Sequence, residues 1–441
     1  MSELDLPEFQ VVSREEENNG DYLYHVSIKT SSQCCPVCDS TSINKHGAHN
    51  RMVRDLSKFG HRVGIHIMGN RYMCKDCSAT FSDELESVEP NGKITLRMKD
   101  YIKRESLKRP FLQIAQEFGI TSTTVKRIFC EYEEELNKQR VLYAPEILGI
   151  DEVHLNKQMR GVFTDIRFGR IIEMTEKRTK IEVISFLQQL PNSQNIKIVT
   201  IDRCTTYREA VFEVLPHTRV VIDKFHVIKM AVAALENTRK QMNGAVSKRE
   251  RSHLLHLRYL LLANYESLSE EQHLRLKVIF SDYPCFELPY LLKEELREMY
   301  KSQTTADAIR CFELWKDHIP PEMTDFVEIS KTIYRWRNEI FSYFDCRVTN
   351  ATTESLNNLI KCIQRQARGY TFEVLRTKVL YGTKATKKAA YSFSKPKSNS
   401  SKTMFSYKYG VGNDLYQTKM LVTGTGTDIN ELIEVFEDGD F

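Results

Sequence analysis

The run ILGID (147–151) decides the fold of this chain, because it opens a series of short apolar runs rich in β-branched residues. The others are GVFTDIRF (161–168), IKIVTID (196–202) and TRVVID (218–223). Such runs are typical of buried strands, and amphipathic stretches near 181–190 and 206–214 separate the later ones. Strands that alternate with amphipathic helices predict an α/β domain.

Helical patterns lie on both sides of this region. From Leu96 to Arg140, and again from Phe225 to about Phe344, apolar residues recur at helical spacing, as in LLHLRYLLL and PYLLKEEL. Another helix is expected from about Thr352. The longer helical block therefore interrupts the α/β domain.

Composition excludes several classes of protein. The 441 residues predict two to four domains at ~150 residues each, and 41% hydrophobic with 28% charged residues is ordinary for a globular chain. No run approaches the ~20 uncharged apolar residues of a membrane span, and the acidic start MSELDLPEFQ is unlike a signal peptide. We therefore expect a cytoplasmic protein with no membrane partner.

Charge is unevenly distributed, although the net charge is only +4. The segment from Lys361 to Lys402 has eleven Lys and Arg residues against one acid, Glu373. The segment from Ser42 to Cys77 has seven against two. These two basic segments are the candidates for contact with phosphates.

Two CxxC pairs stand out among the eleven cysteines. Cys35 with Cys38, and Cys74 with Cys77, each place two thiolates on a tight turn, and two such turns supply the four sulfur ligands of one structural zinc ion. The segment HRVGIHIMGNRYMC (61–74) is predicted to form a hairpin that brings the pairs together, as in a zinc ribbon. A closed four-sulfur site has no open position for catalysis, so the module is expected to hold a basic hairpin against phosphates.

Other interpretations of these cysteines stay open at this point. Surface thiols at accidental spacing are one, and a redox CxxC is another, although redox motifs occur singly beside a βαβ unit. Cys34 is then a spare thiol. Four histidines could replace a cysteine as ligands: His46, His49, His61 and His66.

The segment FLQIAQEFGITSTTVKRI (111–128) predicts a helix-turn-helix. Ala115 suits a close helix crossing, Gly119 suits the turn, and Val125 and Ile128 suit the inner face of the second helix. That helix can be capped by the residue at 121 or 122. The side chains left to face a DNA groove are Ser122, Thr123, Thr124, Lys126 and Arg127. An ordinary αα-hairpin of a helical bundle is the alternative.

Three aspartates end apolar runs, namely Asp151, Asp202 and Asp223. A carboxylate at the C-terminal end of a strand is rigidly held yet exposed at the rim of the sheet, where a pair can bind a metal ion. A single aspartate there is more often a turn residue or a helix cap, so none is decisive alone.

A fourth acid, Glu354, lies early in the helix expected after Thr352. One face of that helix is polar and consists of Glu354, Asn357, Lys361 and Arg365. Glu354 could instead interact only with the helix dipole. That alternative does not account for the polar residues that continue as far as Tyr370.

Taken in order, these motifs resemble those of bacterial insertion-sequence transposases of the ISL3 type, which have a DDE catalytic domain. The resemblance covers roughly residues 30 to 385. It rests on the double CxxC, the helix-turn-helix, and four later stretches: Gly149 to Glu152, Asp202 with Tyr207, Asp223 to His226, and Asn350 to Tyr370. One departure, Val153 to Lys157 in place of an aromatic-rich sequence, affects no catalytic residue. The tail beyond about 391 has no match.

The resemblance implies an α/β RNase H-like catalytic domain with a large all-α insertion, preceded by a zinc ribbon and a helix-turn-helix domain. Asp151, Asp202 and Glu354 would hold two Mg²⁺ (or Mn²⁺) ions, which activate the attacking oxygen and stabilise the leaving oxygen of a phosphodiester displacement. Asp202 is preferred to Asp223 as second ligand, because the strand of Asp223 lies about 4.8 Å further from that of Asp151. Accessory roles fall to Asp223, His226, Asn357, Lys361 and Arg365.

The expected function is that of a transposase that binds the terminal inverted repeats of its element and cuts and joins DNA, as a homodimer in the DNA complex. The helix-turn-helix would read the element ends. The basic stretch from Lys361 to Lys388, with Arg368, would hold DNA without sequence preference. A non-catalytic DNA-binding regulator and an RNase H-like structure-specific nuclease are the alternatives.

The expected domain organisation has seven parts. An N-terminal segment (1–30) precedes the zinc ribbon-like module and the helix-turn-helix, and a linker and tail of unknown role end the chain. The remaining boundaries are 31–90 for the ribbon, 91–142 for the helix-turn-helix, 143–226 for the first catalytic part, 227–345 for the insertion, 346–390 for the catalytic C-terminal helices and 391–441 for the tail.

Overall fold

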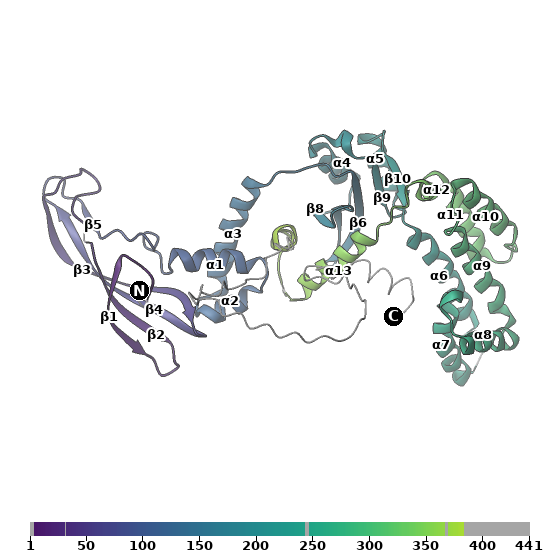
Figure 1. The fold of residues 1–441 in the computed structure, drawn as a ribbon, viewed down its shortest axis with the longest axis horizontal. Coiled ribbons are helices and arrows are strands. Elements are labelled where there is room, and N and C mark those ends of the chain that lie inside the picture. Colours follow the sequence, from purple (N-terminus) through teal and green to yellow (C-terminus); the bar gives the residue numbers. More distant parts are fainter. Residues whose placement is uncertain (1–3, 31, 243–246, 367–368, 383–441) are drawn as a thin grey trace, which may run out of the picture. The chain divides into compact units, whose positions relative to one another are not determined.

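The computed structural model describes residues 4–30, 32–242, 247–366 and 369–382, which form two units (Figure 1). The N-terminal unit contains the described residues up to Val141 together with those from Ile363 onward, and the α/β unit runs from Leu142 to Cys362. Arg368 and the predicted linker and tail lie outside the described residues. None of the described helices is long and apolar enough to cross a membrane.

A five-stranded sheet begins the N-terminal unit. Its strands are β1 (Phe9–Glu16), β2 (Tyr22–Ile28), β3 (Ile43–Lys58), β4 (His61–Cys74) and β5 (Thr80–Ser82), in the order β1-β2-β4-β3 with β5 also on β4. Alternate residues of β2 and β4, such as Val26, Ile65 and Ile67, are buried in one core. The segment predicted as separate at 1–30 therefore supplies two strands of the sheet that carries the zinc ribbon.

The hairpin predicted within HRVGIHIMGNRYMC is wrong, because this segment is the single strand β4. It pairs antiparallel with β3 along its length, and the turn between them is Phe59-Gly60, with φ of 50° and 86°. A two-residue turn with both φ values positive matches the twist of the flanking strands. β3 is mostly polar and exposed, so its alternation gives little hydrophobic signal.

Three helices follow the sheet, as predicted for residues 96–140. They are α1 (Leu96–Ser106), α2 (Phe111–Phe118) and α3 (Ser122–Gln139). Gly119, with φ of 62°, ends α2, and the Thr121 side chain caps α3. Ala115, Val125 and Ile128 are buried between the helices, which confirms the predicted inner face.

The sheet and these helices are joined by polar contacts. Arg54 of β3 donates to the Phe118 carbonyl at 3.1 Å, and Arg62 of β4 donates to the Gln116 carbonyl at 2.7 Å. Both carbonyls lie at the C-terminal end of α2, where backbone oxygens lack partners within the helix. The two arginines therefore cap α2 and fix it on the zinc-ribbon sheet.

The chain returns to the N-terminal unit after Cys362. There α14 (Phe372–Thr377) and a π-helical turn (Lys378–Gly382) pack with α1 to α3. Tyr370 accepts a hydrogen bond from the Phe111 N–H at 2.8 Å, and the buried Lys378 ammonium donates to the carbonyls of Ser106 and Arg109. The segment predicted as catalytic at 346–390 is therefore divided between the two units.

The α/β unit is built on a second five-stranded sheet, in the order β10-β9-β6-β7-β8. The strands are β6 (Ile147–Leu155), β7 (Gln158–Asp165), β8 (Arg170–Thr175), β9 (Ile198–Ile201) and β10 (Arg219–Ile222). β6, β7 and β8 form an antiparallel meander, and β9 and β10 continue the sheet parallel to β6. The two predicted amphipathic helices are confirmed as α4 (Lys180–Gln189) and α5 (Thr205–Val214). β8 has no counterpart among the predicted runs.

A helical block separates β10 from the helix that carries Glu354, as predicted. It contains α6 (Lys224–Met242), α7 (Lys248–Leu262), α8 (Glu270–Asp282), α9 (Glu287–Met299), α10 (Thr305–Asp317), α11 (Thr324–Arg335) and α12 (Arg337–Cys346), with α13 (Ala351–Gln366) after it. Short 3₁₀ turns lie at Ser193–Asn195, Tyr265–Ser267 and Pro284–Phe286. α7 and α8 form a second apolar cluster with parts of α6 and α9, whereas α10 to α12 share the core of the sheet.

Gly149 allows α13 to approach the sheet, and its replacement is expected to destabilise the α/β unit. A Cβ at this position would lie 2.5 Å from Thr353 Oγ1 and closer still to Thr164 Oγ1, and those two hydroxyls are themselves 2.6 Å apart. Gly149→Ala should lower the free energy of unfolding by about 1–3 kcal/mol, measured by urea denaturation. The double variant Gly149→Ala/Thr353→Ala should lose less than the sum of the single losses, because one clash is relieved. Strict additivity would contradict the proposed close approach.

Candidate metal centres

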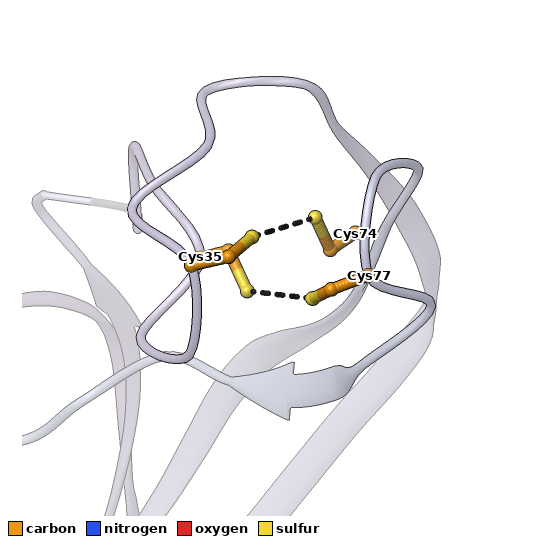
Figure 2. Close-up of side chains that lie close together, drawn as sticks. Cys35, Cys74 and Cys77 are labelled. Carbon is orange, nitrogen blue, oxygen red and sulfur yellow. Dashed lines mark hydrogen bonds between the residues drawn. The ribbon is translucent and has the colours of Figure 1, made fainter.

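The four predicted zinc ligands come together at one end of the N-terminal sheet (Figure 2). The turn with Cys35 and Cys38 precedes β3, whereas Cys74 ends β4 and Cys77 follows it. Because β3 and β4 pair from Ile43 with Cys74, both knuckles lie at the same end of the two strands. The Sγ atoms of Cys35 and Cys77 are 3.6 Å apart, and so are those of Cys38 and Cys74.

The sulfur geometry suits a tetrahedral cation. A Zn–S bond of ~2.3 Å implies Sγ–Sγ edges of about 3.8 Å in a tetrahedron, whereas a disulfide needs ~2.05 Å. Backbone N–H groups of Cys77 and Asp76 lower the pKa of the Cys74 thiol to about 7, which favours the thiolate that binds metal. Cys34 is exposed and outside the cluster, as predicted. His66 instead has its Nδ1 3.0 Å from Nδ1 of His25.

In the α/β unit, strand register places three aspartates side by side. β6 pairs in parallel with β9 up to Ile150 and Ile201, and β9 pairs with β10 up to Ile201 and Ile222. The next residue on each strand is an aspartate. Asp151, Asp202 and Asp223 therefore follow one another across adjacent strands, with Asp202 between the other two. The predicted adjacency of the Asp151 and Asp202 strands is confirmed.

The prediction that Asp151 ends its strand at the exposed rim is wrong. β6 continues to Leu155 in an antiparallel hairpin with β7, and Asp151 is only 6% exposed. Only its parallel pairing with β9 ends at Ile150. The sequence does not show whether the strand ends at Asp151 or continues. Residues 152–155 pair with a segment that starts at Gln158, and this segment lies outside the apolar runs that predict strands.

Asp151 is held by the helix that carries Glu354. Its Oδ2 accepts a hydrogen bond from Asn357 Nδ2 at 2.7 Å, and its Oδ1 accepts the Glu152 N–H. Burial, together with the nearby negative charge of Asp202, raises the pKa of Asp151 to about 7. The two carboxylates therefore repel each other, and a cation bound between them would reduce this repulsion.

His226 connects the other two aspartates. Its Nε2 lies 2.9 Å from Asp202 Oδ2, and its Nδ1 lies 3.8 Å from Asp223 Oδ2. Burial opposes a charge on the ring, but the hydrogen bond with Asp202 and the negative charges of both aspartates outweigh it and raise the pKa of His226 to about 10. Asp223 is fully buried, whereas the side chains of Asp202 and His226 are each 25% exposed.

Helix α13 is attached to the sheet by one polar face. Asn350 accepts from the Thr200 hydroxyl of β9 at 3.0 Å, and the Thr353 hydroxyl lies 2.6 Å from that of Thr164 on β7. Asn357 is one further turn along the same face. Asn350 and Thr353 are positioning residues that the sequence did not single out, since their partners are distant along the chain.

Glu354 is half-buried next to this face. Burial, and then the charge of Asp223, raises the pKa of Glu354. Ligand atoms of Asp223, His226 and Glu354 all lie within 4.8 Å of one another. Further along α13, Lys361 is partly buried and Arg365 is exposed, so the polar face of this helix becomes more exposed toward its C-terminal end.

Some of the predicted DNA-contacting side chains of α3 are exposed to solvent, and others contact neighbouring residues of the same helix. Ser122, Thr123 and Lys126 are exposed, whereas Thr124 contacts the capping residue of the helix. Arg127 is exposed and forms an ion pair with Glu131 one turn later. A salt bridge between exposed side chains is worth little, so it does not prevent Arg127 from contacting another anion.

Comparison with known proteins places the segments that carry both candidate sites in one family. A family model described as a transposase, of the ISL3 type with a DDE domain, matches residues 148–379, and a model described as the zinc-finger of transposase IS204/IS1001/IS1096/IS1165 matches residues 31–77. The chain belongs to the ISL3 family of transposases, and the resemblance seen in the sequence is confirmed.

Two curated relatives are similar over much of the chain. The transposase for insertion sequence element IS1001 of Bordetella parapertussis is 25% identical over 346 residues, which cover 76% of this chain and 85% of the relative. The transposase for IS1557 of Mycobacterium tuberculosis is 26% identical over 275 residues, or 56% of this chain and 61% of the relative.

Removal of one sulfur ligand should release the zinc. Cys74→Ser replaces a thiolate by a hydroxyl that binds zinc weakly, so the purified variant should contain much less than one zinc ion per chain by elemental analysis. Cys34→Ser is the matched control, because Cys34 is the neighbour of a ligand but lies outside the cluster. Full zinc retention in Cys74→Ser would exclude the four-cysteine assignment.

Proposed function

We propose that this transposase binds the terminal inverted repeats of its element and catalyses divalent-metal-dependent DNA strand cleavage and strand transfer. The observation that carries the proposal is that Asp151 and Asp202 are neighbours across two strands, while Glu354 of α13 lies close enough to feel the charges of Asp223 and Asp202. We assign Asp151, Asp202 and Glu354 as the catalytic carboxylates that hold two Mg²⁺ or Mn²⁺ ions. The fold proposed for the α/β unit is RNase H-like, supported by its antiparallel meander continued by two parallel strands.

The donor set fits such ions. Buried side-chain atoms without a hydrogen-bond partner among the described residues include Asp202 Oδ1, both carboxylate oxygens of Asp223 and Asn357 Oδ1. Hard oxygen ligands are those that Mg²⁺ and Mn²⁺ prefer. Unpaired buried oxygens are costly, and coordination to a cation would satisfy them.

When bound, the ions would supply charge that activates the attacking oxygen and stabilises the leaving oxygen of the phosphodiester. The side chains of this chain position that chemistry. Asn357 fixes the orientation of the Asp151 carboxylate through its 2.7 Å hydrogen bond, and Asn350 and Thr353 hold α13 so that Glu354 stays near the aspartates. First a water, and then the 3′-hydroxyl released by cleavage, would attack at this one place.

DNA recognition is proposed for the N-terminal unit. The α2–α3 pair has the features of a helix-turn-helix: a left-handed turn at Gly119, a capped second helix, and an exposed edge with Lys126 and Arg127. We propose that α3 reads the element ends, and that the basic stretch that starts at Lys361 contacts phosphates. A homodimer in the DNA complex and a location at the bacterial nucleoid belong to the same proposal.

Two other functions are compatible with parts of the chain. A regulator without catalysis would need only the zinc ribbon and helix-turn-helix. DNA binding by those modules would not explain why acidic side chains cluster in the α/β unit. A structure-specific nuclease would use the carboxylates but would not join DNA. A strand-transfer assay with precleaved end DNA separates the nuclease from the transposase, because only the transposase would yield joined products.

The carboxylate assignment predicts loss of DNA cleavage without loss of folding. Asp151→Asn, Asp202→Asn and Glu354→Gln each remove one anionic ligand at nearly constant volume, so end binding by gel shift should persist. Nicking with Mg²⁺ should fall by about 10³-fold or more in each, and double variants should lose little more, since residues of one catalytic unit are not additive. Glu152→Gln is the control, because its carboxylate instead pairs with Arg178 at 2.6 Å. Wild-type nicking in all three variants would refute the DDE mechanism.

The helix-turn-helix assignment predicts a loss of sequence preference. Lys126→Ala and Arg127→Ala should reduce the ratio of affinities for end DNA and random DNA, and a lost phosphate contact should reduce the salt slope by about one unit. Lys138→Ala, an exposed lysine in the last turn of α3, serves as the control. An unchanged ratio in the two test variants would make α2–α3 an ordinary hairpin of the helical core.

A further inference from the structure

We propose that Asp223, His226 and Glu354 form a divalent-cation site of their own in the catalytic centre, so that one of the two ions has a nitrogen ligand. This inference rests on the proposed function and deepens it. Asp223 and His226 are then direct ligands, and Glu354 is shared between this site and the pair Asp151 and Asp202. The ion expected is one that accepts both carboxylate and imidazole, such as Mn²⁺.

The geometry of the three residues supports a site. Asp223 directly follows β10, and His226 lies in the first turn of α6, so one short stretch of chain supplies two ligands. Glu354 comes from α13, which is anchored to the sheet on either side of it through Asn350 and Asn357. One ligand atom from each of the three residues lies within 4.8 Å of the others, which is close enough for a common cation.

A second observation concerns Asp223 alone. Its side chain is 0% exposed, and neither of its carboxylate oxygens has a hydrogen-bond partner among the described residues. A buried carboxylate without partners is among the most costly groups in a protein interior. Nδ1 of His226 lies 3.8 Å from Asp223 Oδ2, which is beyond hydrogen-bond distance. A cation bound between Asp223 and Glu354 would remove this cost.

The orientation of His226 is that of a metal ligand. Its Nε2 is within 2.9 Å of Asp202 Oδ2, whereas its Nδ1 is buried without a hydrogen-bond partner. Histidines that bind metals usually donate one ring N–H to a carboxylate, which leaves the lone pair of the other nitrogen for the ion. In this arrangement Asp202 orients His226 with one oxygen and keeps its other oxygen for the neighbouring ion.

The ligand set also predicts which ion is bound more tightly. Mg²⁺ takes oxygen ligands almost exclusively, whereas imidazole is a good ligand for transition-metal ions. A site with two carboxylates and one imidazole should therefore prefer Mn²⁺ to Mg²⁺. A purely structural ion pair between His226 and the aspartates would produce no such preference.

The test is to count Mn²⁺ ions bound to the zinc-loaded full chain by electron paramagnetic resonance, with Mg²⁺ as competitor. Asp223→Asn and His226→Gln should each weaken one class of Mn²⁺ site by about 10-fold or more. His226→Gln keeps an amide that can reach Asp202 but removes the Nδ1 ligand, so it should reduce Mn²⁺ affinity more than Mg²⁺ affinity. Glu152→Gln, whose carboxylate pairs with Arg178, is the matched control and should bind Mn²⁺ like the wild type.

The outcomes separate this site from the proposed function. The site is refuted if the wild type binds no Mn²⁺, or if both Asp223→Asn and His226→Gln bind Mn²⁺ as the wild type does while they remain folded by circular dichroism. If those variants lose the ion but Asp151→Asn still nicks DNA, the cation site stands and the DDE mechanism fails. If Asp151→Asn abolishes nicking and Asp223→Asn retains all bound Mn²⁺, the mechanism stands and the site fails.

Discussion

Parallel, in-register pairing of β6, β9 and β10 is the constraint on which the proposed catalytic centre depends. Because adjacent parallel strands lie only about 4.8 Å apart, one aspartate after each apolar run places three carboxylates in a row. Like charges at such distances disfavour ionisation, and the pKa of Asp151 is accordingly raised, through burial and the charge of Asp202, to about 7. A bound cation, the ring of His226 or a proton on one carboxylate can offset this repulsion.

The helix α13 must be brought close to this row without apolar packing at the point of contact. Gly149 provides the space, and the contact itself is polar: Thr353 with Thr164, Asn350 with Thr200, and Asn357 with Asp151. Hydrogen bonds are directional, so they fix the rotation of the helix better than apolar contacts would. That rotation determines whether Glu354 faces the aspartates.

Much of this site could be predicted from the sequence, because its three aspartates directly follow runs with strong apolar patterns. The cysteine pairs, the turn at Gly119 and the order of Asp151, Asp202 and Glu354 are all local signals. What could not be predicted depends on partners far along the chain. The exposed, polar strand β3 has a weak pattern, β6 extends beyond Asp151 because of its hairpin with β7, and Tyr370 packs on Phe111 although 259 residues separate them.

That last contact also holds the segment after α13 to the helices of the N-terminal unit. Among the described residues, the boundary between the two units falls near Val141 and again near Cys362, and the second boundary lies within α13, the helix that carries Glu354. Beyond that helix, Tyr370 bonds the first residue of α2, and the Lys378 ammonium, whose pKa burial lowers to about 7, holds two carbonyls at the end of α1. In the chain, α13 is therefore followed by a segment that specific polar contacts hold to α1 and α2.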